Sequence, residues 1–279
     1  MKLIAEYNLD THIGNGQSLL FEYYSAVPFF YNDCIYYPHG KGIICCTKVS
    51  LNGNVTECNF AVPPEYKIAW PCDWKMFVFN GHVILSCEEN SSTDCQGIFL
   101  DLDNNMEDIK LPEEIRKQYL CQVIKETEDV KLANCIMHYK NSRSYQCLDF
   151  DNNILWEEKH KAYRYTLFEE KNGCVIFGTA GHGGGVYCYS LLDGVCLCEI
   201  DTKGTYSYGW NGDRIVCQNR EGALIIVNPF ENRIEKEIHL DSKFIKNSGF
   251  YADKQYICAV GFEKKTNSPC LYLFDTRVD

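Results

Sequence analysis

The chain has 279 residues, 46% hydrophobic and 14% aromatic, and its 38 Asp and Glu against 27 Lys and Arg give a formal net charge of −11. This composition provides for a packed core and excludes wholesale disorder. The negative charge argues against nucleic acid or an anionic membrane as the direct partner, and no run approaches the roughly 18 apolar residues of a membrane span.

The first residues, MKLIAEYNLD, carry an acid by position 6 and lack an apolar signal core, so no secretion signal is expected. The 17 cysteines are odd in number, and many lie within apolar strand-like runs, such as Cys45-Cys46, Cys87 and Cys258. Cysteine in such runs behaves as a small buried hydrophobe. We therefore expect reduced thiols in a cytoplasmic protein.

A unit of about 40 residues recurs along the chain, the spacing that is typical of propeller blades. Each copy has two inner apolar strands, a third strand that ends near Asp or Asn, a tight turn and a short outer strand. The sequence predicts an all-β fold, a single β-propeller domain over residues 1–279 with six four-stranded blades. The blades are expected at about 28–60, 74–111, 121–159, 163–201, 204–241, and 242–279 together with 1–10.

The turn between the third and fourth strands carries residues that tolerate positive φ. These pairs are Asn52-Gly53, Asn104-Asn105, Asn152-Asn153, Asp193-Gly194 and Glu231-Asn232. Two-residue hairpin turns require such residues, so the turns agree with the strand pattern on both sides.

The last copy is incomplete, because LYLFDTRVD (271–279) is a third strand with nothing after it. The first strand-like segment, KLIAEYNL (2–9), has no partner before it. We expect this N-terminal strand to complete the last blade, which leaves no open sheet edge. Residues 11–27 remain unassigned, which leaves a seventh blade open, although this segment is too short for four strands.

Two connections stand out between blades. The Pro-rich segment 61–74 reads as a long linker, and residues 112–120 predict a short helix with Pro112 in its first turn.

The hairpins resemble the repeats of the PQQ-like (quinoprotein-type) propeller superfamily, whose units run Ala-x-Asp-x-x-Thr-Gly-x-x-x-Trp, and they overlap with WD-repeat-like propellers. The form is degenerate here, and Trp156 alone retains the docking tryptophan of the family. The resemblance implies the architecture and leaves the function open.

His182-Gly183-Gly184-Gly185 is similar to the oxyanion loop of lipases and esterases, but the chain has no Gly-x-Ser-x-Gly nucleophile elbow. In the repeat register these glycines fall between the second and third strands of the fourth blade. We therefore interpret them as a turn and expect no catalytic residue.

No metal site and no cofactor are expected. The chain lacks Cys-x-x-Cys and His-x-x-x-His pairs. Cys196 and Cys198 would share one strand face, which is more often core than ligand. Asp101, Asp103, Asp149 and Asp151 resemble half of a calcium loop without its later ligands, so they are interpreted as turn residues.

Acids are concentrated between Glu88 and Asp129, a segment that contains twelve Asp and Glu but four Lys and Arg. This segment is either an ordinary solvated face or a landing site for a basic partner. Aromatic anchors with charge complementarity are typical of tight interfaces. The candidate partner-binding residues are therefore Tyr66, Trp70, Trp74, Glu88, Glu89, Asp94, Glu113, Glu114, Tyr119, Tyr206 and Trp210.

These features favour a non-catalytic protein-binding propeller, monomeric apart from its partner. The most specific hypothesis is an immunity or inhibitor protein that blocks a basic nuclease-type toxin, because nuclease sites are positive. One alternative is a generic protein-interaction propeller. The other is a propeller hydrolase or lyase with carboxylates around the channel, which the sequence leaves open.

Overall fold

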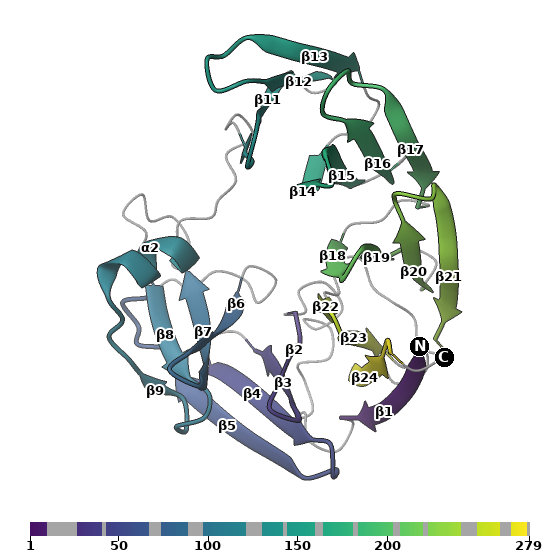
Figure 1. The fold of residues 1–279 in the computed structure, drawn as a ribbon. Coiled ribbons are helices and arrows are strands. Elements are labelled where there is room, and N and C mark those ends of the chain that lie inside the picture. The colour runs from purple at the N-terminus through teal and green to yellow at the C-terminus, as the bar shows by residue number, and fades with distance from the viewer. Residues whose placement is uncertain are drawn as a thin grey trace. The chain divides into compact units, whose positions relative to one another are not determined.

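The computed structural model describes residues 1–9, 27–40, 43–66, 74–88, 97–120, 130–141, 144–159, 164–180, 184–202, 207–219, 223–240, 250–262 and 269–277. These residues form six four-stranded antiparallel sheets, as Figure 1 shows. The six-bladed, all-β organisation predicted from the sequence is confirmed. No helix in these ranges is long and apolar enough to cross a membrane.

The chain divides into two compact units. Unit 1 comprises residues 1–122 and 245–279, and unit 2 comprises residues 123–244. Each unit holds three sheets, and each is described by itself. The assignment of residues 1–279 to one domain stays a prediction.

In unit 1, the first sheet consists of β2 (Phe29–Tyr31), β3 (Cys34–His39), β4 (Ile43–Ser50) and β5 (Val55–Ala61). The second consists of β6 (Lys75–Phe79), β7 (His82–Glu88), β8 (Gly97–Asp101) and β9 (Glu107–Asp108). It is followed by the predicted short helix, α2 (Glu113–Leu120).

The third sheet of unit 1 joins the two ends of the sequence. Its strands are β22 (Phe250–Ala252), β23 (Tyr256–Phe262), β24 (Pro269–Asp275) and β1 (Lys2–Asn8). β1 runs antiparallel to β24 from Lys2 opposite Asp275 to Asn8 opposite Cys270 (Figure 1). The N-terminal strand therefore completes the last blade, as predicted.

In unit 2, the first sheet consists of β10 (Val130–Lys131), β11 (Ile136–Asn141), β12 (Ser144–Leu148) and β13 (Ile154–Lys159). The second consists of β14 (Arg164–Lys171), β15 (Cys174–Ala180), β16 (Gly185–Ser190) and β17 (Cys196–Asp201). The third consists of β18 (Ser207–Asn211), β19 (Arg214–Gln218), β20 (Ala223–Asn228) and β21 (Arg233–His239).

The core lies between neighbouring sheets of each unit, and the third strands of several sheets are deeply buried. Every residue of β20 and of β24 is buried, because both faces of these strands are covered. Such strands read as continuous apolar runs, whereas the outer strand β21 is mostly exposed and carries charges. The repeat pattern in the sequence follows from this difference between third and fourth strands.

The tight turns have the backbone conformation that their residues predict. Gly53, Asn105, Asn152, Gly194 and Asn232 all have positive φ. Asn and Gly adopt this region at low cost, which fixes the register of each hairpin. Residues 181–183 lie outside the described ranges, and Gly184-Gly185 leads into β16, antiparallel to β15.

The cysteines that the structure describes are free thiols. Cys46, Cys87 and Cys258 are fully buried in their strands, as expected for small hydrophobes. The expectation that Cys196 and Cys198 share one face is wrong, since Cys196 is exposed and Cys198 is buried. A register shift opposite Cys188 and Tyr189 inserts a bulge between them and turns Cys196 outward.

Candidate protein-binding surface

The residues predicted to bind a partner are divided between the two units, and the described ones differ in their surroundings. Trp74 is 4% exposed and lies in the core between the first two sheets of unit 1, where the half-buried Tyr66 packs against the same cluster. A tryptophan this deeply packed offers no surface to a partner. Its large apolar ring fills the space between the sheets.

Trp210, in unit 2, is half-buried and packs between the second and third sheets of that unit. Lys171 lies 5.4 Å from the centre of its ring. Glu113 and Glu114 are exposed in the first turn of α2, where acids favour the helix dipole. Glu88 is the last residue of β7, and Tyr119 lies in α2. The remaining candidates fall outside the described residues: Trp70, Glu89, Asp94 and Tyr206.

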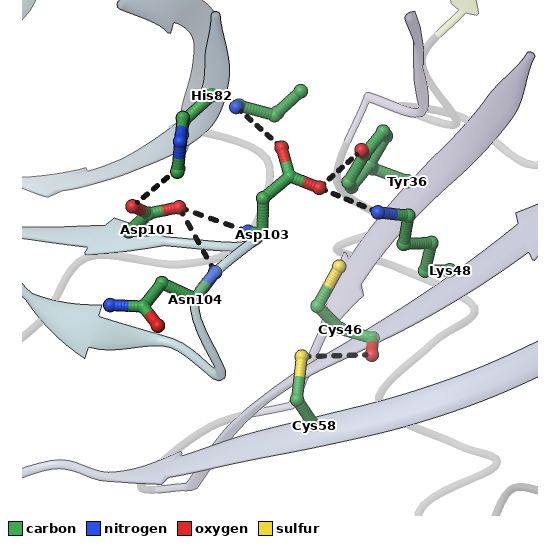
Figure 2. A network of polar contacts seen from close by, with 9 residues as sticks. Tyr36, Cys46, Lys48, Cys58, His82, Asp101, Asp103 and Asn104 are labelled. Atoms are coloured by element: carbon green, nitrogen blue, oxygen red, sulfur yellow. Dashed lines mark hydrogen bonds and ion pairs between the residues drawn. The ribbon is translucent and has the colours of Figure 1, made fainter. Parts of the chain in front are cut away.

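Part of the acidic segment 88–129 serves the fold instead of the surface, as Figure 2 shows. Asp101 is 8% exposed, and one carboxylate oxygen accepts hydrogen bonds from the amides of Asp103 and Asn104 at 3.0 and 3.2 Å. Its other oxygen lies 2.9 Å from His82 Nδ1. Asp101 is thus a turn residue, as the sequence indicates, and it is not free to meet a partner.

Asp103 holds the first two sheets of unit 1 together. One of its oxygens accepts hydrogen bonds from Tyr36 at 2.6 Å and Lys48 at 2.5 Å, and the other accepts from the amide of Val83 at 2.9 Å. Burial acts to raise the pKa of this carboxyl, but these donors outweigh it and hold the pKa below its ordinary value. Asp103 is therefore a partly exposed carboxylate whose two oxygens already have hydrogen-bond partners.

Exposed apolar side chains recur at one place in the third-to-fourth strand turns of unit 2. Phe150, Leu192 and Phe230 each stand two residues before the positive-φ residue of their turn and are 51%, 90% and 36% exposed. Further exposed apolar residues follow on the outer strands. We call the whole set the apolar strip: Phe150, Ile154, Leu155, Leu192, Val195, Leu197, Phe230 and Ile234.

Hydrogen bonds link the three hairpins that carry the apolar strip. Trp156, next to Leu155 on β13, donates a hydrogen bond from its indole nitrogen to the Leu191 carbonyl at 3.3 Å. The amide of Glu199 on β17 donates to Asn232 Oδ1 in the next turn at 3.3 Å. The outer strands β13 and β17 therefore each contact the turn of the following blade, so the three hairpins are neighbours.

The same hairpins are acidic. Residues 149–159, 190–201 and 228–239 contain ten Asp and Glu against three Lys and Arg. Three of these acids are exposed in the turns themselves: Asp151 beside Phe150, Asp193 beside Leu192 and Glu231 beside Phe230. Contiguous exposed apolar residues with a polar rim mark interaction sites. The rim here is negative, so it complements a positive partner.

Sequence reasoning missed the apolar strip because it searched the loops between blades for aromatic residues. The signal was present in the repeats: an apolar residue two positions before the turn Asn or Gly in residues 150, 192 and 230, and also at Leu51 in unit 1. Such a residue reads as core in a single hairpin. Its recurrence at a turn position, where the side chain stays 36% to 90% exposed, distinguishes it.

No group of three or more metal-ligating side chains occurs within the ranges that the structure describes. The turns at Asp101 and Asp149 use their carboxylates to cap backbone amides, which accounts for the pairs that resemble half of a calcium loop.

Comparison with known proteins gives structural likeness alone. No protein-family model matches the chain, and no curated protein matches it. Among solved structures it is similar to BamB from Moraxella catarrhalis, with 14% identity over 88% of this chain and 71% of that one and a TM-score of 0.40. It is also similar to the computationally designed Ika8 protein, with 9% identity over 90% of this chain and 71% of Ika8 and a TM-score of 0.41. The designed Ika4 protein has 10% identity over 54% of this chain and 92% of Ika4, with a TM-score of 0.39. The blade assignment therefore rests on the six sheets themselves.

Proposed function

We propose that this chain is a non-catalytic, cytoplasmic protein-binding propeller that takes a basic protein on the apolar strip of unit 2. The observation that carries the proposal is the recurrence of Phe150, Leu192 and Phe230 at one turn position of three consecutive blades. A repeated exposed apolar residue adds nothing to the core. Its position suits contact with a partner that spans several blades.

The side chains of the apolar strip and the acids beside it indicate which kind of partner would fit. Apolar side chains flanked by Asp151, Asp193 and Glu199 fit a protein surface that has apolar anchors within a field of Lys and Arg. The anchors supply most of the affinity, and the charges speed association.

In its specific form, the proposal is an immunity or inhibitor protein whose basic partner is a nuclease-type toxin. Nuclease active sites carry positive charge because they bind phosphate, and an acidic cover with apolar anchors can occupy such a site. The formal charge of −11 supports this form.

The experiment compares the wild-type chain with the triple variant Phe150→Ser, Leu192→Ser, Phe230→Ser as bait in native lysate, at low and then high salt. The control variant is Leu51→Ser, which changes the matching turn position of unit 1, where Leu51 is 38% exposed. The partner recovered is then purified and its Kd is measured for all three chains.

We expect wild type and Leu51→Ser to retain one basic protein, and the triple variant to bind it at least about 100-fold more weakly, since anchors cost about 1–2 kcal/mol each. Equal binding by all three chains, or no basic protein retained, would contradict the proposal. The purified partner is assayed for nuclease activity with and without this chain. A partner without such activity rejects the toxin form and leaves the protein-binding function standing.

A further inference from the structure

Two cysteines face each other on neighbouring strands of unit 1. Cys46 on β4 and Cys58 on β5 are register partners in the antiparallel pairing. The Cys58 thiol donates to the Cys46 carbonyl oxygen at 3.6 Å, as Figure 2 shows. Directly opposite residues have Cβ atoms about 4.5–5.5 Å apart, so a small approach of the strands is enough for a disulfide.

A fixed cation lies on the same face of this sheet. Lys48 follows Cys46 by two residues on β4, and alternate residues of a strand share a face. Its ammonium is held by Asp103 at 2.5 Å and lies 4.8 Å from the centre of the Tyr36 ring. Lys48 is therefore positioned, and its charge acts on both thiols.

The two thiols differ in acidity. The hydrogen bond from Cys46 lowers the pKa of Cys58, and Lys48 adds to this effect against burial and the carboxylates of Asp103 and Glu57. The same hydrogen bond, together with complete burial, raises the pKa of Cys46. Cys58 is thus the thiol that loses its proton first, and the thiolate is the nucleophile in disulfide exchange.

Access follows the same order. Cys46 is fully buried, whereas Cys58 is half-buried. A reagent from solvent therefore meets Cys58 before Cys46.

We propose that Cys58 and Cys46 form a thiol–disulfide exchange site that takes a small disulfide of the glutathione type. The Cys58 thiolate attacks one sulfur of the small disulfide, whose S–S bond breaks and releases one thiolate, and a mixed disulfide remains on Cys58. Cys46 then gives up its proton and attacks the Cys58 sulfur, which releases the second small thiol. The small disulfide is reduced to two thiols, and the protein dithiol is oxidised to one disulfide.

The chain contains a matched pair that lacks these features. Cys188 and Cys198 in unit 2 are also register partners on neighbouring strands, but both are buried. Burial raises the pKa of both thiols, that of Cys198 to about 12. Both pairs lie opposite each other on neighbouring strands, so this placement alone does not distinguish Cys46 and Cys58. The pair Cys188–Cys198 therefore serves as the internal control.

The test incubates the native full-length chain with oxidised glutathione at pH 7.5, blocks free thiols with N-ethylmaleimide at timed intervals, and maps the linkages by mass spectrometry. We expect the Cys46–Cys58 disulfide to form at least about tenfold faster than the Cys188–Cys198 disulfide, in keeping with thiolate content and access. Formation of both disulfides at the same rate, or of neither, would overturn the proposal.

Two variants test the order of the steps. Cys46→Ala should stop at the mixed disulfide on Cys58, and Lys48→Met should slow its formation severalfold, with Lys171→Met in unit 2 as the control for loss of a paired lysine. No mixed disulfide in folded Cys46→Ala would contradict the assignment of Cys58 as the attacking thiol.

If Cys46→Ala does not fold, the assignment of Cys58 as the attacking thiol is tested in the wild-type chain, by measuring how fast each cysteine is alkylated by iodoacetamide. Cys58 should then react faster than the half-buried Cys34, whose pKa burial raises. Equal rates at the two cysteines would reject the assignment.

Discussion

Trp156 on the outer strand of one blade donates its indole hydrogen to the Leu191 carbonyl in the turn of the next blade, at 3.3 Å. Its ring also stacks on Tyr189, with ring centres 5.5 Å apart and planes at 21°. The one residue that retains the docking tryptophan of the PQQ-like repeat thus packs against the neighbouring blade. This contact joins two blades of unit 2 beside the apolar strip.

The close approach of Trp156 predicts the effect of Gly194→Ala. A Cβ at Gly194 would lie 2.6 Å from Cγ of Trp156, and Gly194 has φ +68°. Gly53→Ala is the matched control, since φ is +86° and no atom lies within 4 Å of the added Cβ. We expect urea denaturation to show a loss of about 1–2 kcal/mol for Gly53→Ala and clearly more for Gly194→Ala. Equal losses would mean that Trp156 moves aside without cost.

Asp103→Asn should destabilise unit 1, because Lys48 and Tyr36 lose their common charged acceptor. We expect a loss of about 1–3 kcal/mol in the free energy of unfolding. Asp213→Asn is the control, since it removes a lysine pair of equal length, 2.5 Å, whose Asp213 side chain is 60% exposed, and it should cost less than about 1 kcal/mol. Equal costs would argue that the Asp103 network adds nothing to stability.

His39 predicts a loss of stability in mild acid. Its side chain is 5% exposed, and burial lowers its pKa from 6.5 to about 4. Between these values the unfolded chain binds a proton that the folded chain does not. The resulting stability is present above about pH 6.5 and is lost as the pH falls toward 4.

The measurement is the free energy of unfolding at pH 7 and pH 4.5. We expect the pH-dependent loss to be about 2 kcal/mol smaller in His39→Gln than in wild type. His239→Gln, at a side chain 66% exposed, should keep the wild-type loss. A wild-type loss in His39→Gln would show that His39 protonates without unfolding.

Leu192→Ala should leave stability nearly unchanged although it removes a large apolar side chain. Leu192 is 90% exposed, so we expect a change within about 0.5 kcal/mol. Leu224→Ala in the same unit, at a fully buried leucine, should cost about 2–5 kcal/mol. Thermal or urea unfolding of the two variants checks the difference, and a large loss in Leu192→Ala would indicate a packing role for the apolar strip.

The fold could be predicted because its signals are local and repeated. Gly194 and Asn232 lie in the turns of hairpins whose third strands, β16 and β20, are buried along all or nearly all of their length, and both features lie within about fifteen residues. The closing role of β1 could also be predicted, because the last copy lacks a strand and the first segment has no partner.

The burial and the polar partners of individual side chains were harder to predict, because they depend on contacts between distant residues. Lys48 and Asp103 are 55 residues apart in the sequence, and no motif links them. Trp74 is a residue type that is common in interfaces, but it lies in the core. Its burial follows from packing between two sheets, which the local sequence does not reveal. The bulge that turns Cys196 outward is likewise set by pairing with another strand.

The pairing of β1 with β24 has a consequence for synthesis of the protein. The partner strand of β1 is made more than 260 residues after β1 itself. The sheet that holds both strands therefore cannot form until β24 has been synthesised, whereas the three sheets of unit 2 lie within one continuous stretch and need no later residue. A chain that stops before residue 269 would leave β1 and β23 each with an unpaired edge, the kind of edge that recruits other chains into aggregates.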